Sequence, residues 1–510
     1  MRHPAHGSAW RRAAAVGLVL GLAAVARAQA AAPPPAPAEA PPPLSEDRLE
    51  ATLRAQRGGL RADDVARRAE LTSPDVRARQ RAVDAARARV DQAVLGFVPR
   101  LTGSARYVRQ SEIPVPVLGN IVVSPLTGNL ANICPPGGPC LAVSAPFQFP
   151  LAVDLYTLQA GLQVPVSDYV LRLSQSYAAA SHSASAARYN EGATRLAVQR
   201  DAKRIFYNWA RTRASVVVAE QALATAREHL KDVNAAFHVG TASKADVLRV
   251  ESQVAGSELL VERAHNLAAV VDEQLRIVLH DPPAARYALG EDLTDGLPPQ
   301  GAAPLPDLYG EALGRRVELR ALDESLAALR ASRRLAAAGY YPRLDAVANL
   351  YRSNPNPRYF PIIGVWHTTW DVGVQLTWTV NDTLTAPSQV RDALARTAEL
   401  AAQRAALADG IRMEVMQAYT SLREAEFALA TTARQLQAAQ ESYRVRRDLF
   451  RAGRATSAEL TDAETDLVRA RLDLINARID ARIARISLEH ALGRDVPAAG
   501  PRAQASSPSR

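Results

Sequence analysis

The chain carries one short pattern twice, as FHVGTASKADVL (residues 237–248) and FRAGRATSAELT (residues 450–461). A Phe, a Gly, an Ala, a hydroxyl residue and an acid fall at the same offsets in both copies. Gly240 and Gly453 suit the left-handed position that ends a helix. The hydroxyl residue and the acid three positions after it suit the start of the next helix. The pattern therefore predicts the tips of two antiparallel helix hairpins.

Long segments without proline flank both tips. No Pro occurs between residues 165 and 282 or between residues 387 and 497, although the chain has 33. Proline breaks helix interiors, and the residues found instead are mostly strong helix formers. We expect one helix over residues 171–239, about 100 Å long at about 1.5 Å per residue, and a second over residues 388–452. Pro387 would lie in the first turn of the second helix, where proline is tolerated. Helices of this length need support from neighbouring helices, as in a coiled coil.

Alternating segments lie before each long helix. In YTLQAGLQVPV (residues 156–166) and WDVGVQLTWTV (residues 370–380), apolar residues alternate with small or polar ones. The alternation extends over about 11 positions, the length of a transmembrane barrel strand. Weaker alternation over residues 101–107 and 344–351 predicts their partner strands. Each strand alone would also fit a half-buried strand of a soluble sandwich.

The whole order of elements is duplicated. GFVPRLTGSARY (residues 96–107) resembles GYYPRLDAVANLY (residues 339–351), and LQVPVSD (residues 162–168) resembles LTWTVND (residues 376–382). Each half is expected to run helix, strand, loop, strand, long helix, turn and helix, and such internal repeats decide the fold class. Four long strands per chain cannot close a membrane barrel, which needs about eight, and lipid does not tolerate unpaired strand edges. Copies of the chain must therefore associate, and either two copies or three would satisfy this requirement.

In this duplicated order the chain resembles the bacterial outer-membrane efflux protein family, the TolC-like channels. The resemblance extends over about residues 44–496. It is carried by the two PRL strand starts, the VPVSD and VND strand ends, and the acid six positions after each tip Gly. It implies a mixed fold, in which an all-α coiled-coil tunnel joins a transmembrane β-barrel with four strands per chain, completed by trimerisation.

The same resemblance implies a function and a set of partners. The protein would be the exit duct of a tripartite efflux system, passively conducting substrates across the periplasm and the outer membrane. A homotrimer in outer-membrane lipid would work with a periplasmic adaptor and an inner-membrane pump, as in drug efflux or type I secretion. An iris-like gate at the periplasmic helix tips would control the duct.

Residue roles at the tips also follow from the resemblance. Acids of the second tip would line the constriction, and the acid of the first tip would tie it to its neighbour. These pore-gate residues are Glu459, Asp462 and Asp246. The adaptor would dock on Gly240, Thr241, Ser243, Gly453, Arg454 and Thr456. In a trimer, Glu459 and Asp462 would place six carboxylates near the axis, and such a ring attracts cations. The alternative is that each acid only caps its own helix.

Two positions depart from the family pattern around the second tip. A TolC-like channel has Tyr three residues before the tip Gly and Arg two residues after it, whereas this chain has Phe450 and Ala455. Arg454 is adjacent to the second position. The hydrogen bonds and ion pairs that lock the resting gate in the family therefore cannot be copied here intact.

The ends of the chain differ in composition from the repeats. Arg11 and Arg12 precede an apolar run over residues 13–25 and a small-residue site, as in a secretory signal peptide. The run is too short to cross a bilayer as a helix, which takes about 20 residues. The expected organisation is a signal peptide (1–28), a Pro-rich linker (29–43), a first repeat (44–283), an equatorial segment (284–314), a second repeat (315–496) and a disordered tail (497–510). The exported protein is expected to be integral to the outer membrane and to extend into the periplasm.

The chain has two cysteines, Cys134 and Cys140. Export would bring them into an oxidising compartment, so we expect a loop-closing disulfide, with two free thiols as the alternative. Two thiolates without a nearby His or acid cannot complete a metal site, so neither a metal nor a cofactor is expected.

Composition and motifs argue against other classes of protein. The net charge is +9, but acids are interleaved with the bases, so a nucleic-acid-binding stripe is not expected. Neither HExxH nor GxxxxGK[ST] occurs, and no enzyme is expected. The main alternative is a periplasmic adaptor with a long coiled-coil hairpin. An adaptor would carry one hairpin inserted in β domains rather than a duplicated unit.

Overall fold

The structure is a computed structural model, and it describes residues 46–112, 119–123, 143–146, 152–294, 303–360 and 362–495. Several features expected from the sequence lie outside these ranges. The signal peptide, the Pro-rich linker, Cys134, Cys140 and the tail after residue 496 lie outside the described residues.

Long helices make up most of the described chain. α5 (Ser174–His238) and α6 (Lys244–Leu279) form one hairpin, and α9 (Val380–Arg451) and α10 (Ser457–Ala491) form the other. α5 has 65 residues and α9 has 72, so each extends about 100 Å at about 1.5 Å per residue. The two hairpins expected from the sequence are therefore confirmed. The shorter helices are α1 (Glu46–Leu53), α2 (Ala62–Thr72), α3 (Pro74–Leu95), α4 (Val166–Asp168), the π-helical turn η2 (Tyr169–Leu173), α7 (Leu305–Arg315), α8 (Val317–Ala337) and the 3-10 turn η3 (Ala338–Tyr340).

Pro387 lies inside α9, so the expectation that it occupies the first turn is wrong. The helix already begins at Val380, soon after the preceding strand ends at Thr377. Proline has no N–H, so the carbonyl four residues earlier loses its helical partner. The adjoining Ala386 is nevertheless fully buried and lies close against Gly339 of η3. Packing of the first two turns on η3 thus outweighs the local break.

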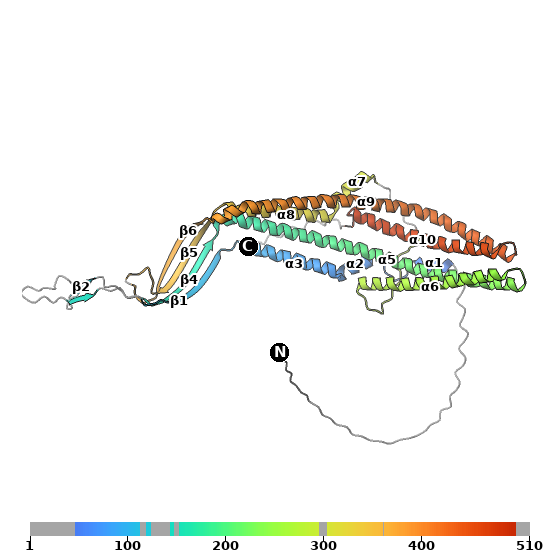
Figure 1. Cartoon of the computed structure of the whole chain (residues 1–510), viewed down its shortest axis with the longest axis horizontal. Helices are drawn as coiled ribbons and strands as arrows, with labels where there is room; N and C mark the ends of the chain where they lie inside the picture. Colours follow the sequence, from blue (N-terminus) through green and yellow to red (C-terminus); the bar gives the residue numbers. More distant parts are fainter. Residues whose placement is uncertain are drawn as a thin grey trace, which may run out of the picture. The chain divides into compact units, whose positions relative to one another are not determined.

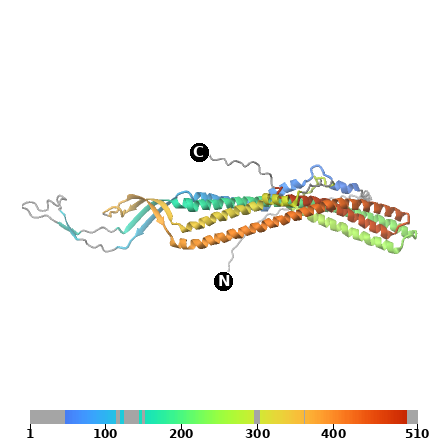
Figure 2. The same cartoon turned by 90° about the horizontal axis from the view of Figure 1, so that it is seen from above.

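The helices lie lengthwise beside one another (Figures 1 and 2). α5 occupies the middle: toward the tips it packs between α6 and α10, and toward the sheet it packs between α3 and α8. α9 packs on α8 and α10. α6 and α9 therefore form the two flanks of the layer around the tips.

The main core sits where α1 and α2 cover one face of α5. Phe206 and Trp209 of α5 are almost completely buried there, together with Leu275 of α6 and Ile479 of α10. The chain after α1 runs beside the chain after α6, and the Leu60 N–H donates to the carbonyl of residue 288 at 2.8 Å. We call α1, α2 and these two paired connecting segments the belt, and the side of the helical layer that they cover the belt face.

Four strands form one antiparallel sheet in the order β1 (Arg100–Arg109), β4 (Asp154–Val164), β5 (Arg343–Asn354) and β6 (His367–Thr377). The strand pairs expected from the sequence are confirmed, although β4 and β6 begin and end two or three residues earlier than expected. Between β1 and β4, β2 (Asn120–Val123) pairs with β3 (Val143–Pro146).

One face of the sheet is apolar and exposed. On β6, Trp370 and Val374 are 70% and 71% exposed. The register aligns apolar residues across all four strands, as in the row Leu101, Leu162, Ala348 and Val372. Apolar side chains in this position need a covering, and none of the residues that the structure describes supplies it.

The opposite face of the sheet is polar. The Gln159 side chain donates to Asn349 at 3.3 Å, and the Asn349 amide donates to Asp371 at 2.9 Å. β1 and β6 are the edges of this sheet, and within the described residues neither has a second partner strand. Across the same described ranges, no helix has an apolar stretch long enough to cross a membrane.

Candidate functional site

The ends of α5 and α9 are closed by the same backbone hydrogen bonds. Gly240 has a φ of 82° and Gly453 a φ of 69°, the left-handed conformation that favours glycine. The N–H groups of Gly240 and Thr241 donate back into the last turn of α5 at 3.0 and 2.9 Å. Gly453 and Arg454 do the same in α9 at 2.9 and 2.8 Å. These bonds satisfy carbonyls that the helix ends would otherwise leave unpaired.

Each following helix begins with a reciprocal cap. The Asp246 N–H donates to Ser243 Oγ at 3.2 Å, and the Ser243 N–H donates to the Asp246 carboxylate at 3.0 Å. Thr456 and Glu459 form the same pair at 3.3 and 3.0 Å. The Ser243 hydroxyl and N–H hold the pKa of Asp246 below its ordinary value, and the Thr456 N–H lowers the pKa of Glu459. The expected helix starts are confirmed, and both acids act as caps.

Acids follow one stripe along α10. Glu459, Asp466, Asp473 and Asp480 are spaced by seven residues, which keeps them on one side of a helix in a coiled coil. Asp462, which is exposed, lies beside the start of this stripe. Glu459 also pairs with Arg446 of α9 at 3.1 Å, with both side chains half-exposed. The two acids predicted for the carboxylate ring, Glu459 and Asp462, are therefore adjacent on an accessible surface.

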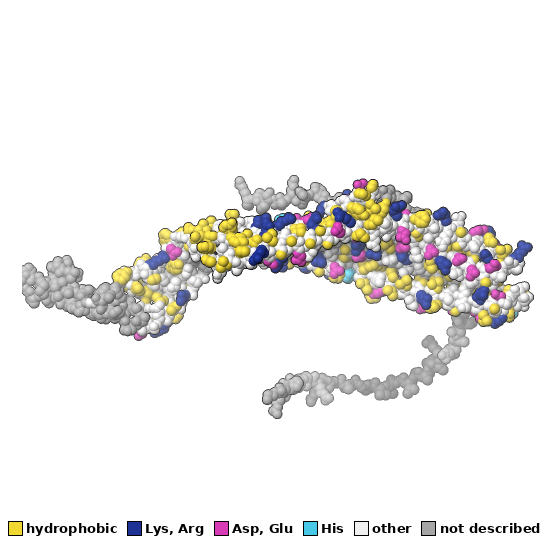
Figure 3. Space-filling model, turned by 45° about the horizontal axis from the view of Figure 1, so that its top comes forward, with side chains coloured by type: hydrophobic (Ala, Val, Ile, Leu, Met, Phe, Trp, Pro, Cys, Tyr) yellow, Lys and Arg dark blue, Asp and Glu magenta, His cyan; other side chains and the backbone are white. Residues whose placement is uncertain are grey.

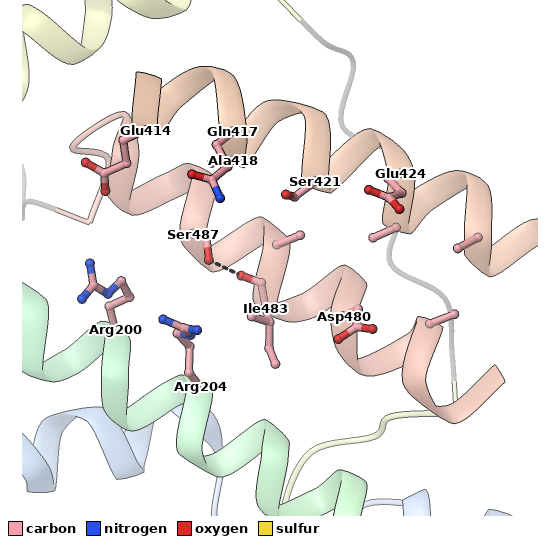
Figure 4. Close-up of a pocket in the computed structure, with 14 residues that line it drawn as sticks. Arg200, Arg204, Glu414, Gln417, Ala418, Ser421, Glu424, Asp480, Ile483 and Ser487 are labelled. Atoms are coloured by element: carbon pink, nitrogen blue, oxygen red, sulfur yellow. Dashed lines mark hydrogen bonds between the residues drawn. The ribbon is translucent and has the colours of Figure 1, made fainter. Parts of the chain in front are cut away.

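This stripe lies on the side of the layer away from the belt. At the end of the stripe far from the tip, Asp480 and Ser487 of α10 line a groove of about 580 Å³. Arg204 of α5 forms part of the wall of this groove (Figure 4). The neighbouring Lys203 points to the other side, where it meets Asp63 of α2 at 2.6 Å. We call the side with the stripe and this groove the groove face. Acidic and basic side chains are interleaved over the helices (Figure 3).

Phe450 joins the two hairpins near the tips. Its ring meets the His229 ring edge-on, with 5.5 Å between centroids, and it packs against the buried cluster formed by Val233, Val247 and Val250. Because Phe450 has no hydroxyl, this contact depends on packing rather than on a hydrogen bond.

A buried polar cluster lies behind Phe450. His229 Nδ1 of α5 is 3.2 Å from the Glu464 carboxylate of α10, and its Nε2 is 3.3 Å from Ser457 Oγ. Gln253 of α6 donates to the same Glu464 oxygen at 2.8 Å. The His229 and Glu464 side chains are only 1% and 5% exposed. We call these four residues the tip cluster.

The tip cluster is absent from the expectations drawn from the sequence, although a signal was present. Glu464 lies between Leu460 and Leu467, which are buried on the inner side of α10. A charged residue on such an apolar stripe is almost never buried without a partner. The stripe thus indicated that Glu464 had a partner, but it did not identify His229.

The six residues predicted to dock an adaptor are all exposed at the tips: Gly240, Thr241, Ser243, Gly453, Arg454 and Thr456. The two tips lie together at the end of the helices far from the sheet (Figures 1 and 2). The structure pairs each acid with the hydroxyl residue at the start of its own helix, and Asp246 and Glu459 belong to separate caps.

Comparisons with known proteins agree on one family and one fold. A family model described as outer membrane efflux protein matches residues 65–279 and 308–494. A structure of CusC matches with a TM-score of 0.68 and 15% identity, over 85% of this chain and 92% of that chain. The outer-membrane channel OprN matches with a TM-score of 0.67 and 18% identity, over 87% and 95%. The outer membrane protein VceC from Vibrio cholerae matches with a TM-score of 0.67 and 17% identity, over 85% and 96%. No curated protein matches the sequence.

Proposed function

The chain belongs to the outer membrane efflux protein family, and from this we infer that it is the exit duct of a tripartite efflux system. In this proposal a homotrimer conducts substrates passively across the periplasm and the outer membrane. A periplasmic adaptor and an inner-membrane pump select and deliver the substrate, and the duct itself performs no catalytic step.

The observation that carries the proposal is the sheet, with its exposed apolar face and its two edges at β1 and β6. Lipid offers no water to satisfy edge N–H and C=O groups, so a sheet in a membrane must close. Pairing β1 of one copy with β6 of the next closes it, and three copies give twelve strands. The apolar face then meets lipid and the polar face lines the lumen, as in other membrane barrels.

Aromatic side chains support a position in the bilayer. Tyr107 and Tyr156 lie 5.0 Å apart between ring centroids on the apolar face, and Trp366 lies 6.1 Å from Tyr156. They mark the end of the sheet far from the helices, and the exposed Trp378 marks the other end. Such residues gather where a membrane barrel meets the headgroups.

The flanks of the helical layer support association of copies. Leu267 and Val270 of α6 are each 55% exposed, and Met413 and Phe427 of α9 are 70% and 73% exposed. In a closed trimer α6 of one copy would lie against α9 of the next. Burial of these side chains would add to the stability gained by closing the barrel.

The groove face is the proposed wall of the tunnel, because the belt occupies the other side of the layer. Glu459 and Asp462 would then lie closest to the axis at the periplasmic end, where three copies bring six carboxylates together. A ring of this kind attracts cations and repels anions. Opening the tips would require the α9–α10 hairpin to move away from α5–α6.

Two measurements test this proposal: the membrane fraction in which the protein is recovered, and the ionic current that it carries in a planar bilayer. The proposal expects heat-modifiable oligomers in the outer-membrane fraction, and recovery in the soluble periplasm would refute the duct. In planar bilayers, Glu459→Ala with Asp462→Ala should raise conductance or reduce cation selectivity. Unchanged conductance together with unchanged selectivity would refute the acidic ring.

A matched control for this pair is Glu258→Ala. Glu258 pairs with Arg227 at 2.8 Å, and both side chains are exposed. Arg227 lies seven residues after Glu220, which meets Arg48 of α1, so this pair belongs to the belt face. Removing its carboxylate should leave conductance and selectivity unchanged.

A further inference from the structure

The loop between β5 and β6 is anchored over the polar face of the sheet. Arg358 donates to the Asp371 carboxylate at 2.8 Å and to the Trp370 carbonyl at 2.9 Å. Its guanidinium also lies 5.5 Å from the ring centroid of Tyr351. The Asp371 and Tyr351 side chains both belong to the polar face, because they alternate with the apolar positions of β6 and β5. Arg358 therefore holds the loop on that side.

A second anchor fixes the start of the loop. Asn356 is 2% exposed, and its amide donates to the His367 carbonyl at 3.2 Å and to Thr369 Oγ1 at 3.3 Å. Its carbonyl oxygen accepts the Arg358 N–H at 2.9 Å. Tyr359 then stacks on His367, with 3.9 Å between ring centroids. Both anchors bend the loop toward the same face.

The loop reaches across the sheet. A cavity of about 380 Å³ is lined by Arg106 of β1 and Thr157 of β4 together with Pro357 and Ile362 of the loop. These strand residues also belong to the polar face, since Arg106 and Thr157 are opposite each other in the register. Ile362 therefore lines a cavity together with residues of β4 and β1, on the polar side of the sheet.

The proposed barrel is narrow enough for a loop on its inner face to reach the axis. Twelve strands about 4.8 Å apart and tilted by about 40° close with a backbone radius of about 12 Å. An arm of five residues reaches up to about 17 Å. Three inward loops of this length can therefore approach the axis.

We propose that three copies of this loop form an apolar constriction inside the barrel, at the end far from the helices, ringed by Ile362 and Ile363. These side chains are 41% and 46% exposed. Arg358 adds no net charge to the ring because Asp371 neutralises it. Hydrophobic constrictions impede ions by dewetting, so this exit favours weakly charged, amphipathic solutes over small ions. The inference rests on the proposed function, which supplies the trimer and the lumen.

The test measures access from outside, because this readout does not depend on the gate at the tips. Gln163→Cys places a thiol on the polar face of β4, at its helix end and beyond the loop. Intact cells receive a charged maleimide that cannot cross the outer membrane. Combining Gln163→Cys with Ile362→Ser and Ile363→Ser should raise the labelling rate by roughly tenfold, as expected when a dewetted ring becomes polar.

Three controls keep the result specific. Ile362→Leu with Ile363→Leu keeps the ring apolar and should label at the rate of Gln163→Cys alone. Protein without Gln163→Cys reports labelling of the native cysteines. If the serine variant does not assemble, Arg358→Ala releases the loop from Asp371 and should raise the rate, whereas Arg358→Lys should do so less.

The outcomes separate this inference from the proposed function. Equal labelling rates in the serine and leucine variants, or in Arg358→Ala and the parent, would refute the constriction while leaving the duct in place. If Gln163→Cys stays unlabelled in every variant and no heat-modifiable trimer forms, the duct itself is refuted, and the constriction is refuted with it.

Discussion

Removing the carboxylate of the tip cluster should loosen the two hairpins from each other. Glu464→Ala leaves His229 and Gln253 without the group that they share, at a place where the His229 side chain is 1% exposed. Leaving a buried polar group without its hydrogen-bond partner costs about 1–3 kcal/mol. At about 1.4 kcal/mol per factor of ten, local opening becomes about five- to a hundredfold more frequent.

The structure argues for the lower part of that range. Gln253 and Glu464 also line a groove of about 560 Å³ between α6 and α10. Water entering from this groove can hydrate the polar groups that the substitution leaves behind. Glu464→Gln should cost less than Glu464→Ala, because an amide still bonds to both neighbours.

Hydrogen exchange followed by mass spectrometry measures this opening directly. In Glu464→Ala, amides near residues 225–240 and 455–470 should lose protection, while amides of the belt keep theirs. Glu258→Ala removes an exposed carboxylate from the same pair of helices as His229 and Gln253, where about 0–1 kcal/mol is expected. Equal protection in Glu464→Ala, Glu258→Ala and the parent would show that the cluster does not hold the tips.

Three further predictions concern the tips and the helix junctions. Gly453→Ala should destabilise the second tip by about 1–2 kcal/mol, because Gly453 has a left-handed backbone conformation. Limited proteolysis of the tip should then be faster. Gly192→Ala, inside α5, should instead stabilise the helix by about 0.5–1 kcal/mol. The pKa of Glu459 is held below its ordinary value of 4.5 by the Thr456 N–H, so the cap is intact above about that pH and is lost as the pH falls through the lowered pKa. A spin label on the second tip should therefore become more mobile on acidification, and Glu459→Gln should remove this step. Arg316 is buried and donates to carboxylates of α8 and α9, with Glu318 at 3.0 Å. Arg316→Met should lower the free energy of unfolding by about 2–3 kcal/mol, which is below the range for a fully buried pair. Calorimetry should show a lower Tm.

The tips could be predicted from the sequence because their chemistry is local. A glycine in the left-handed region and a cap between residues three apart require no knowledge of distant contacts. The alternation of β4 and β6 likewise depends only on neighbouring positions. The start of α9 was misplaced because Ala386 packs on Gly339 of η3, and the position of Pro387 in the sequence does not reveal that distant contact.

The contacts that join the two halves could not be predicted in the same way. His229 and Glu464 are 235 positions apart, and each has an unremarkable place in its own helix. The β5–β6 loop poses the same difficulty, because its direction depends on Arg358 finding Asp371 rather than on any turn signal. The acids at the tips could be predicted from the sequence, whereas their meeting around an axis depends on contacts between copies of the chain.

A buried hydrogen-bonded polar pair is better suited than an apolar contact to a junction that must open. When His229 and Glu464 are enclosed, their hydrogen bond replaces bonds that both groups would make with water, so its net contribution is only about 1 kcal/mol. When the hairpins separate, water hydrates the two groups again, so the open state is not penalised by exposed apolar surface at this point. Replacing both residues with Leu would change that balance, because replacing both partners of a buried hydrogen bond with apolar groups can be neutral or stabilising, and it would favour the joined state. The pair therefore specifies how the hairpins fit while leaving a small difference between joined and separated states, and a partner bound at the exposed tip residues could overcome a difference of that size.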